Sequence, residues 1–142
     1  PQHIIQVGNA GGSGQGAFVS DAGVWTNVSD RRLKHNIVDA SYGLNEVLQL
    51  RPVQYEMNLN DEKQIGFIAQ EVKKVVPEVV SGTEGDLNKN QILGLSYGNL
   101  VPVLVNGIKE QQKMIDELKI ESNAQQKLLL ELKAEIELLK KK

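Results

Sequence analysis

The chain has 142 residues, with 16 basic and 18 acidic side chains and a formal net charge of -2. This balance gives no electrostatic reason to expect a nucleic acid or an acidic membrane as partner, and no uncharged apolar run is long enough to cross a bilayer. With no cysteine and only the histidines His3 and His35, we expect no disulfide, no metal site, no cofactor and no histidine-based triad within one chain.

Residues 1–28 have the pattern of short β-segments joined by glycine, and an opening without methionine predicts a piece of a longer protein. Stretch 8–16 is too rich in glycine to be a helix. We expect strands at Ile4–Val7, Ala17–Val19 and Val24–Thr26, with a turn at Asp21–Gly23. One interpretation is a flexible linker. The other is the end of a repetitive β-structure, which has too few large apolar residues to bury a core without partner chains.

The next stretch, 29–40, holds a Ser and a Lys five positions apart, with Asp30 directly after Ser29. A Ser hydroxyl is a weak nucleophile until a base takes its proton, and a desolvated Lys such as Lys34 is one known base for that purpose. Ser29 and Asp30 could instead form a turn or a helix cap. A short strand is expected at His35–Val38. The basic side chains have the composition of a solvated face; they are Arg31, Arg32, Lys34 and His35.

From Ser41 onward the pattern predicts a small α+β core with short strands and helices. Ser41 is the expected N-cap of a helix that runs to about Leu50 and is ended by Pro52. The further elements expected are strands Val53–Met57 and Gln64–Ile68 as a hairpin, a helix Ala69–Val76 stopped by Pro77, a short strand at Val79 and Val80, a polar loop 81–90, and a strand Ile92–Leu95.

A helix is predicted from about Asn99 to the end of the chain, with Pro102 tolerated only in its first turn. Heptads predict a parallel coiled coil, with a positions at Ile108, Ile115, Ser122, Leu129 and Ile136, and d positions at Gln111, Leu118, Gln125, Leu132 and Leu139. Ile at a with Leu at d favours two strands, whereas Met114 and Leu128 at g widen the apolar face. From these rules, dimer and trimer remain equally open.

Several motifs at matching spacing carry a family resemblance; they are Ser29–Ile37, Tyr42–Leu44, Leu50–Tyr55, Ile65–Val72, Pro77–Val80, Leu95–Pro102 and Lys109–Gln112. The chain from Ser29 onward resembles the C-terminal intramolecular chaperone domain, the S74 peptidase family, of phage tailspikes, tail fibres and neck appendages.

The resemblance implies a homotrimer that assists folding of the upstream fibre of the same polypeptide and then releases itself by autoproteolysis between Val28 and Ser29. Ser29 would be the nucleophile and Lys34 the general base of a single-turnover serine endopeptidase. Asp30, His35 and Asn36 are candidate supporting residues, although Asp30 could bond only the backbone, and His35 and Asn36 could lie on the surface. The implied domains are 1–28 as the end of the fibre, 29–98 as the chaperone core and 99–142 as a trimeric coiled coil. The fibre would be a virion protein made in the bacterial cytoplasm.

A lysine amine of ordinary pKa, about 10.4, is protonated at neutral pH, so burial or cationic neighbours must favour its neutral form. We expect this desolvation only when chains pack, so that cleavage reports correct assembly. Backbone N–H groups are the expected oxyanion donors. Two alternatives remain: a non-cleaving trimeric structural stalk, and a hydrolase acting on other proteins, for which no substrate cleft is evident from the sequence.

Overall fold

The computed structural model describes residues 5–7, 16–20, 22–58 and 60–141. The chain divides into two compact units, Pro1–Asp39 and Ala40–Lys142. His3, Asp21 and most of the glycine-rich stretch 8–16 lie outside the described residues.

The N-terminal unit contains an antiparallel three-stranded sheet in the order β1 (Ile5–Val7), β2 (Ala17–Val19) and β3 (Trp25–Asn27). The β2–β3 connection turns at Gly23, whose φ of +76° is a conformation that favours glycine, and its N–H donates to the Ser20 carbonyl at 2.8 Å. The predicted strands are confirmed, with the third displaced by one residue.

Beyond this sheet the chain forms one turn of 3₁₀ helix, η1 (Arg31–Leu33), and then continues without regular structure. The predicted strand His35–Val38 is wrong. Asn36 adopts a left-handed conformation with φ of +49°, which turns the chain away from an extended path. A strand also needs a ladder partner, and none of these residues pairs with a strand in the described part of the chain.

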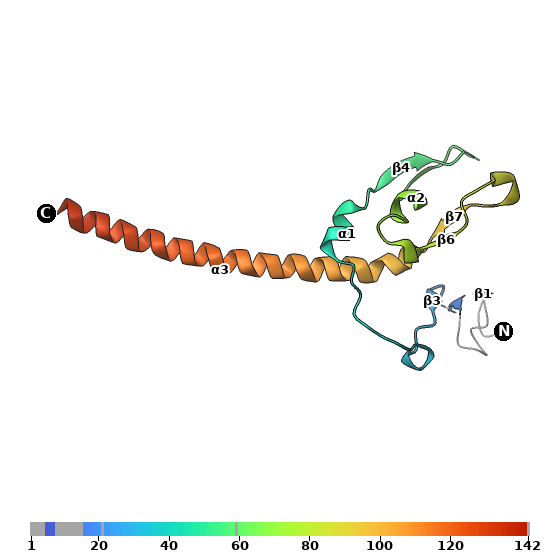
Figure 1. The fold of residues 1–142 in the computed structure, drawn as a ribbon, viewed down its shortest axis with the longest axis horizontal. Coiled ribbons are helices and arrows are strands. Elements are labelled where there is room, and N and C mark those ends of the chain that lie inside the picture. The colour runs from blue at the N-terminus through green and yellow to red at the C-terminus, as the bar shows by residue number, and fades with distance from the viewer. Residues whose placement is uncertain (1–4, 8–15, 21, 59, 142) are drawn as a thin grey trace. The chain divides into compact units, whose positions relative to one another are not determined.

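The C-terminal unit combines two antiparallel hairpins with short helices and one long helix (Figure 1). In chain order the elements are α1 (Leu44–Gln49), β4 (Val53–Glu56), β5 (Lys63–Gly66), α2 (Ala69–Val72), η2 (Pro77–Val79), β6 (Val80–Gly82), η3 (Leu87–Lys89), β7 (Leu93–Leu95), η4 (Tyr97–Leu100) and α3 (Val101–Lys140). The predicted hairpin pairs Val53 with Gly66 and Glu56 with Lys63. This architecture confirms the α+β class.

Two helix boundaries differ from the sequence prediction. Helix α1 begins after Gly43 rather than Ser41, because the Glu46 carboxylate accepts the Gly43 N–H at 2.8 Å and so caps the helix from within. Helix α2 ends at Val72, and Val76 leaves the helical region with φ of -135° and ψ of 78°. The latter follows from Pro77, which disfavours the helical conformation at the residue before it.

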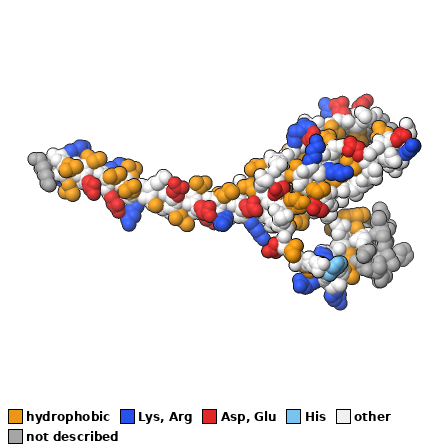
Figure 2. Space-filling view, viewed as in Figure 1, with side chains coloured by type: hydrophobic (Ala, Val, Ile, Leu, Met, Phe, Trp, Pro, Cys, Tyr) orange, Lys and Arg blue, Asp and Glu red, His pale blue; other side chains and the backbone are white. Residues whose placement is uncertain are grey.

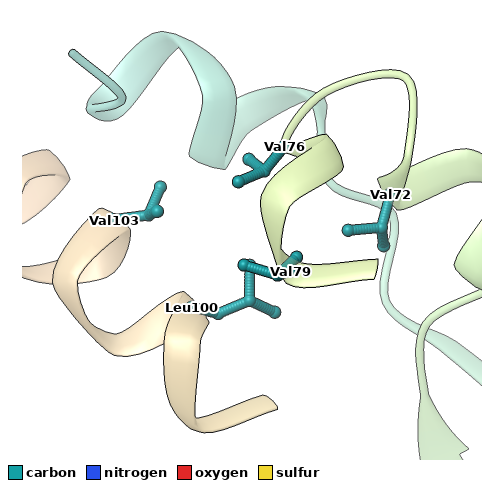
Figure 3. Packing of buried hydrophobic residues seen from close by; sticks show 5 residues of the cluster. All are labelled: Val72, Val76, Val79, Leu100 and Val103. Atoms are coloured by element: carbon teal, nitrogen blue, oxygen red, sulfur yellow. The ribbon is translucent and has the colours of Figure 1, made fainter. Parts of the chain in front are cut away.

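The core of this unit is a cluster of buried apolar side chains that joins α2 and η2 to η4 and the first turn of α3 (Figure 3). Its members are Val72, Val76, Val79, Leu100 and Val103. Partly buried side chains pack around it: Tyr42, Val47, Leu50, Phe67, Val75, Val80 and Leu95. The cluster therefore determines where the long helix starts relative to the hairpins.

Helix α3 is 40 residues long and carries Pro102 in its first turn, as predicted. Its early turns pack against α1, where Gly107 is buried beside Val47 and the Asn106 amide donates to the carbonyls of Ala40 at 3.2 Å and Tyr42 at 3.1 Å. Described residues of α3 from 108 onward are all exposed.

Apolar side chains recur along the exposed part of α3 (Figure 2). Those at the predicted a and d positions are Ile108, Ile115, Leu118, Leu129, Leu132, Ile136 and Leu139. No helix within the described residues combines the length and the apolar character needed to cross a membrane.

Candidate functional site

The upstream side of the site is anchored to the N-terminal sheet. Strand β3 ends at Asn27, and the N–H of the next residue, Val28, donates to the Gly16 carbonyl at 3.0 Å. Val28 is half-buried, whereas Ser29 directly after it is exposed. The peptide bond between Val28 and Ser29 therefore lies one residue past a strand whose position is held by hydrogen bonds.

The downstream side is a single 3₁₀ turn that brings the chain back on itself. Asp30 is its N-cap, with Oδ1 accepting the Arg32 N–H at 2.8 Å. The Leu33 N–H donates to the Asp30 carbonyl at 3.1 Å, and the Lys34 N–H donates to the Arg31 carbonyl at 3.0 Å. Because a 3₁₀ helix completes a turn in about three residues, the residue after the turn returns toward the residue before it.

This turn brings together the two residues that the sequence singled out. The Lys34 Nζ donates to the Ser29 Oγ at 2.6 Å. If the amine were neutral, the same contact would allow the hydroxyl to donate its proton to nitrogen, which is the geometry that general-base activation of a nucleophile requires. Both side chains are exposed in this chain.

The carboxylate of Asp30 is engaged by a different cation. Arg32 donates Nε to Oδ1 at 3.0 Å and Nη2 to Oδ2 at 2.6 Å, a bidentate fork. The Arg32 side chain first, and its backbone N–H second, hold the pKa of the Asp30 carboxyl below its usual range. Asp30 is therefore the N-cap of this turn, which was the alternative to a catalytic role in the sequence analysis, and its carboxylate also forms an ion pair with Arg32.

His35 and Asn36, the other suggested supporting residues, are not brought into this contact. Both are exposed, and within the described residues neither side chain makes a hydrogen bond. Arg32, by contrast, was placed only in a basic cluster by the sequence. Its specific pairing could have been found from the spacing, since an arginine two residues after an N-cap aspartate lies within reach of the carboxylate.

A shallow groove in the C-terminal unit offers no second catalytic arrangement. It is lined by Tyr55, Phe67, Ile68, Ala69, Gln70, Leu93, Leu95 and Tyr97. No nucleophile stands beside a base among these lining residues. The rings of Phe67 and Tyr97 lie 6.1 Å apart, and the Tyr97 hydroxyl accepts the Phe67 N–H at 3.1 Å, which is a packing arrangement. Among the described residues, no group of three or more acidic or histidine side chains could hold a metal ion.

Comparisons with known proteins find similarity to one family and to two phage proteins. Residues 29–81 match the model of the Peptidase_S74 family, described as chaperone of endosialidase. The chain is also similar to the long tail fiber protein Gp37 of Enterobacteria phage M1 and to that of Enterobacteria phage Ox2. In both cases 33% of residues are identical over 98 residues, which cover 64% of this chain and 38% of the relative.

The chain thus spans little more than a third of the length of these relatives. The match of the family begins at Ser29, the residue whose hydroxyl meets Lys34. Residues 29–81 are thus similar to the Peptidase_S74 family, the chaperone of endosialidase, which agrees with the resemblance stated from the sequence.

Proposed function

We propose that this chain contains the intramolecular chaperone of a phage tail fibre, which trimerises, assists folding of the fibre upstream of it, and then detaches by cutting its own chain between Val28 and Ser29. The observation that carries this proposal is the 2.6 Å contact between the Lys34 amine and the Ser29 hydroxyl at the point where the family match begins. The fibre would be part of the virion, made in the cytoplasm of the bacterial host.

The proposed reaction uses only this chain and water. Neutral Lys34 takes the proton of the Ser29 hydroxyl while Oγ bonds to the Val28 carbonyl carbon. The C–N bond then breaks, and the proton passes from Lys34 to the released Ser29 nitrogen. An ester joins Val28 to Ser29 Oγ. Water hydrolyses it, leaving a carboxylate at Val28 and a free hydroxyl and amine at Ser29.

The placement of the bond supports this reaction. The Val28 N–H is held by the Gly16 carbonyl, so the acyl side is fixed against the sheet, while the 3₁₀ turn holds the amine against the hydroxyl. Holding reacting groups in place in this way removes much of the entropic cost of the attack.

Helix α3 supports the assembly step. Its apolar a and d side chains are exposed between Ile108 and Leu139, a seam of about 46 Å. Such a face is stabilised by burial against copies of itself rather than by the helix alone. Joining three chains through α3 would also raise the local concentration of their upstream β-segments, which is how assembly would assist folding of the fibre.

Packing of chains would also start the reaction. In the single chain the Lys34 side chain is exposed to solvent. Exclusion of water by neighbouring chains would favour the neutral amine, so that only assembled molecules cut themselves. A Lys34→Ala variant that assembles and is still cut would contradict this step.

Intact-mass measurement of the full chain after expression tests cleavage directly. The expected products are one fragment that ends at Val28 and one that begins at Ser29. Ser29→Ala and Lys34→Ala should each leave the chain uncut. The matched controls Ser41→Ala and Lys63→Ala change exposed residues of the other unit and should be cut like the parent chain. Cleavage at another bond, or cleavage of Ser29→Ala, would refute the assignment.

Analytical ultracentrifugation tests assembly with a matched pair of variants. Leu132→Glu places a charge at a d position and should give the mass of one chain, because like charges would meet in the seam. Leu130→Glu makes the same change two residues earlier at a b position, which is 67% exposed, and should leave the trimer intact. A parent chain that sediments as a monomer would refute trimerisation.

One observation favours the second candidate, a trimeric stalk that does not cleave. Ser29 and Lys34 are both exposed, as an inert surface pair would be. The stalk would show a single intact mass in material that sediments as a trimer, and the same mass for the Lys34→Ala variant.

A further inference from the structure

The carboxylate of Asp30 could prevent Lys34 from acting as the proposed base. Asp30 precedes Lys34 by four residues across a single turn, within reach of a flexible lysine side chain. An opposite charge within about 4–6 Å favours the charged form of an ionisable group. If Asp30 paired with Lys34, the amine would be held as ammonium and could not accept the proton of Ser29.

In the structure this pairing does not form, because Arg32 occupies both carboxylate oxygens of Asp30. The Lys34 amine contacts the Ser29 hydroxyl instead. The ionisable side chains of the described part of this unit are Asp30, Arg31, Arg32, Lys34, His35 and Asp39. Within that part, the side chains of Arg31 and Asp39 make no ion pair. The ion pair between Asp30 and Arg32 is therefore the one that determines whether a free carboxylate lies near the Lys34 amine.

Resting on the proposed self-cleavage, we propose that Arg32 is a positioning residue, which keeps the Asp30 carboxylate away from Lys34 and so leaves the amine free to act on Ser29. A guanidinium suits this task, because its planar fork satisfies both oxygens at once and it stays charged at any pH that the reaction meets. The pair is 88% exposed on the Arg32 side and 40% on the Asp30 side, so its effect in the single chain is small. The effect of this ion pair on the Lys34 amine becomes larger once packing of chains excludes water, since charges interact more strongly at low dielectric.

The test measures the rate of self-cleavage of the full chain as a function of pH. Arg32→Gln frees the carboxylate and removes a neighbouring positive charge, and both changes favour the ammonium. Cleavage at pH 7 should slow by roughly two- to tenfold. The acid side of the pH–rate profile should move to higher pH, and the rates of parent and variant should converge at high pH, where the amine is neutral in both.

A second variant separates this electrostatic role from support of the turn. Asp30→Asn combined with Arg32→Gln lacks the carboxylate, while Asn caps a helix about as well as Asp. Its rate at pH 7 should return to within about twofold of the parent. Arg31→Gln is the charge-matched control: it removes one positive charge but leaves Asp30 held by Arg32, so it should slow cleavage less than Arg32→Gln does.

Two outcomes would overturn the inference while leaving the proposed function intact. One is a parent chain that is cut in a Ser29-dependent manner, with Arg32→Gln cut equally fast at pH 7. The other is an Arg32→Gln defect that Asp30→Asn does not relieve, or that persists unchanged at high pH, which would assign Arg32 to the turn alone. A parent chain that is never cut, by contrast, would refute the self-cleavage itself.

Discussion

Replacing Val76 by alanine tests whether the small core holds α2 and η2 against the start of the long helix. Val76 is 1% exposed and lies in the cluster with Val103 and Leu100, which come from α3 and η4 (Figure 3). The substitution removes the two buried γ-methyl groups of Val76. At about 0.8 kcal/mol for each buried carbon, this corresponds to roughly 1.6 kcal/mol of lost transfer free energy.

The void adds a second contribution. Two methyl-sized groups leave roughly 50 Å³, which at about 24 cal/mol per Å³ adds up to about 1.2 kcal/mol if the neighbours do not relax. We therefore expect Val76→Ala to lower the free energy of unfolding by about 2–3 kcal/mol. Because partial collapse of the site would reduce the second contribution, the lower end of this range corresponds to a core that relaxes.

Urea unfolding measures this change, at one protein concentration for all variants because the stability of an assembling protein depends on concentration. Hydrogen exchange of peptides covering 69–80 should become faster in the same variant. Leu48→Ala, at a side chain that is 76% exposed on α1, is the control and should change stability by less than about 0.5 kcal/mol. Equal effects of the two substitutions would refute the description of Val76 as a core residue.

Two further predictions concern the polar contacts of the C-terminal unit. A Cβ at Gly66 would collide with the Tyr97 hydroxyl, which accepts the Phe67 N–H, so Gly66→Ala should lower the urea-derived free energy of unfolding by about 1–3 kcal/mol. The Gly43 N–H holds the pKa of the Glu46 carboxyl below its usual range. Ionised Glu46 therefore stabilises the fold above its unfolded-state value, about pH 4.3, and this contribution is lost as the pH falls through the folded value. Glu46→Gln should be less stable than the parent at pH 6, and the difference should shrink as the pH falls below the unfolded-state value; a difference that stays constant as the pH falls would contradict this origin.

Local chemistry made several elements predictable from the sequence. Pro102 is compatible with a helix only in its first turn, and the helix begins at Val101. Alternating apolar residues around a polar turn predicted the β4–β5 hairpin, since a period of two places one face inward. The spacing from Ser29 to Lys34 was also visible, although spacing alone does not bring two side chains into contact.

Other boundaries depended on contacts that no local rule contains. Ser41 is a good N-cap by residue type, yet α1 begins after Gly43, where the chain is held by the Glu46 carboxylate, with the Glu110 carboxylate accepting the Leu44 N–H. Glu110 lies far along the sequence on the long helix, so its contribution to this cap arises only once the chain has folded.

By itself the sequence determined the composition limits, the α+β class and the long amphipathic helix, because each depends on residue type and periodicity along the chain. The ordered motifs of the sequence also carried the similarity of residues 29–81 to the Peptidase_S74 family. Tertiary structure decided which charges meet. Asp30 could have joined Lys34, Arg31 or Arg32, and the geometry of one 3₁₀ turn assigned it to Arg32 and left the Lys34 amine at the Ser29 hydroxyl. The physical reason is that ion pairs among flexible neighbouring side chains differ little in intrinsic energy, so the backbone conformation that presents them selects the pairing.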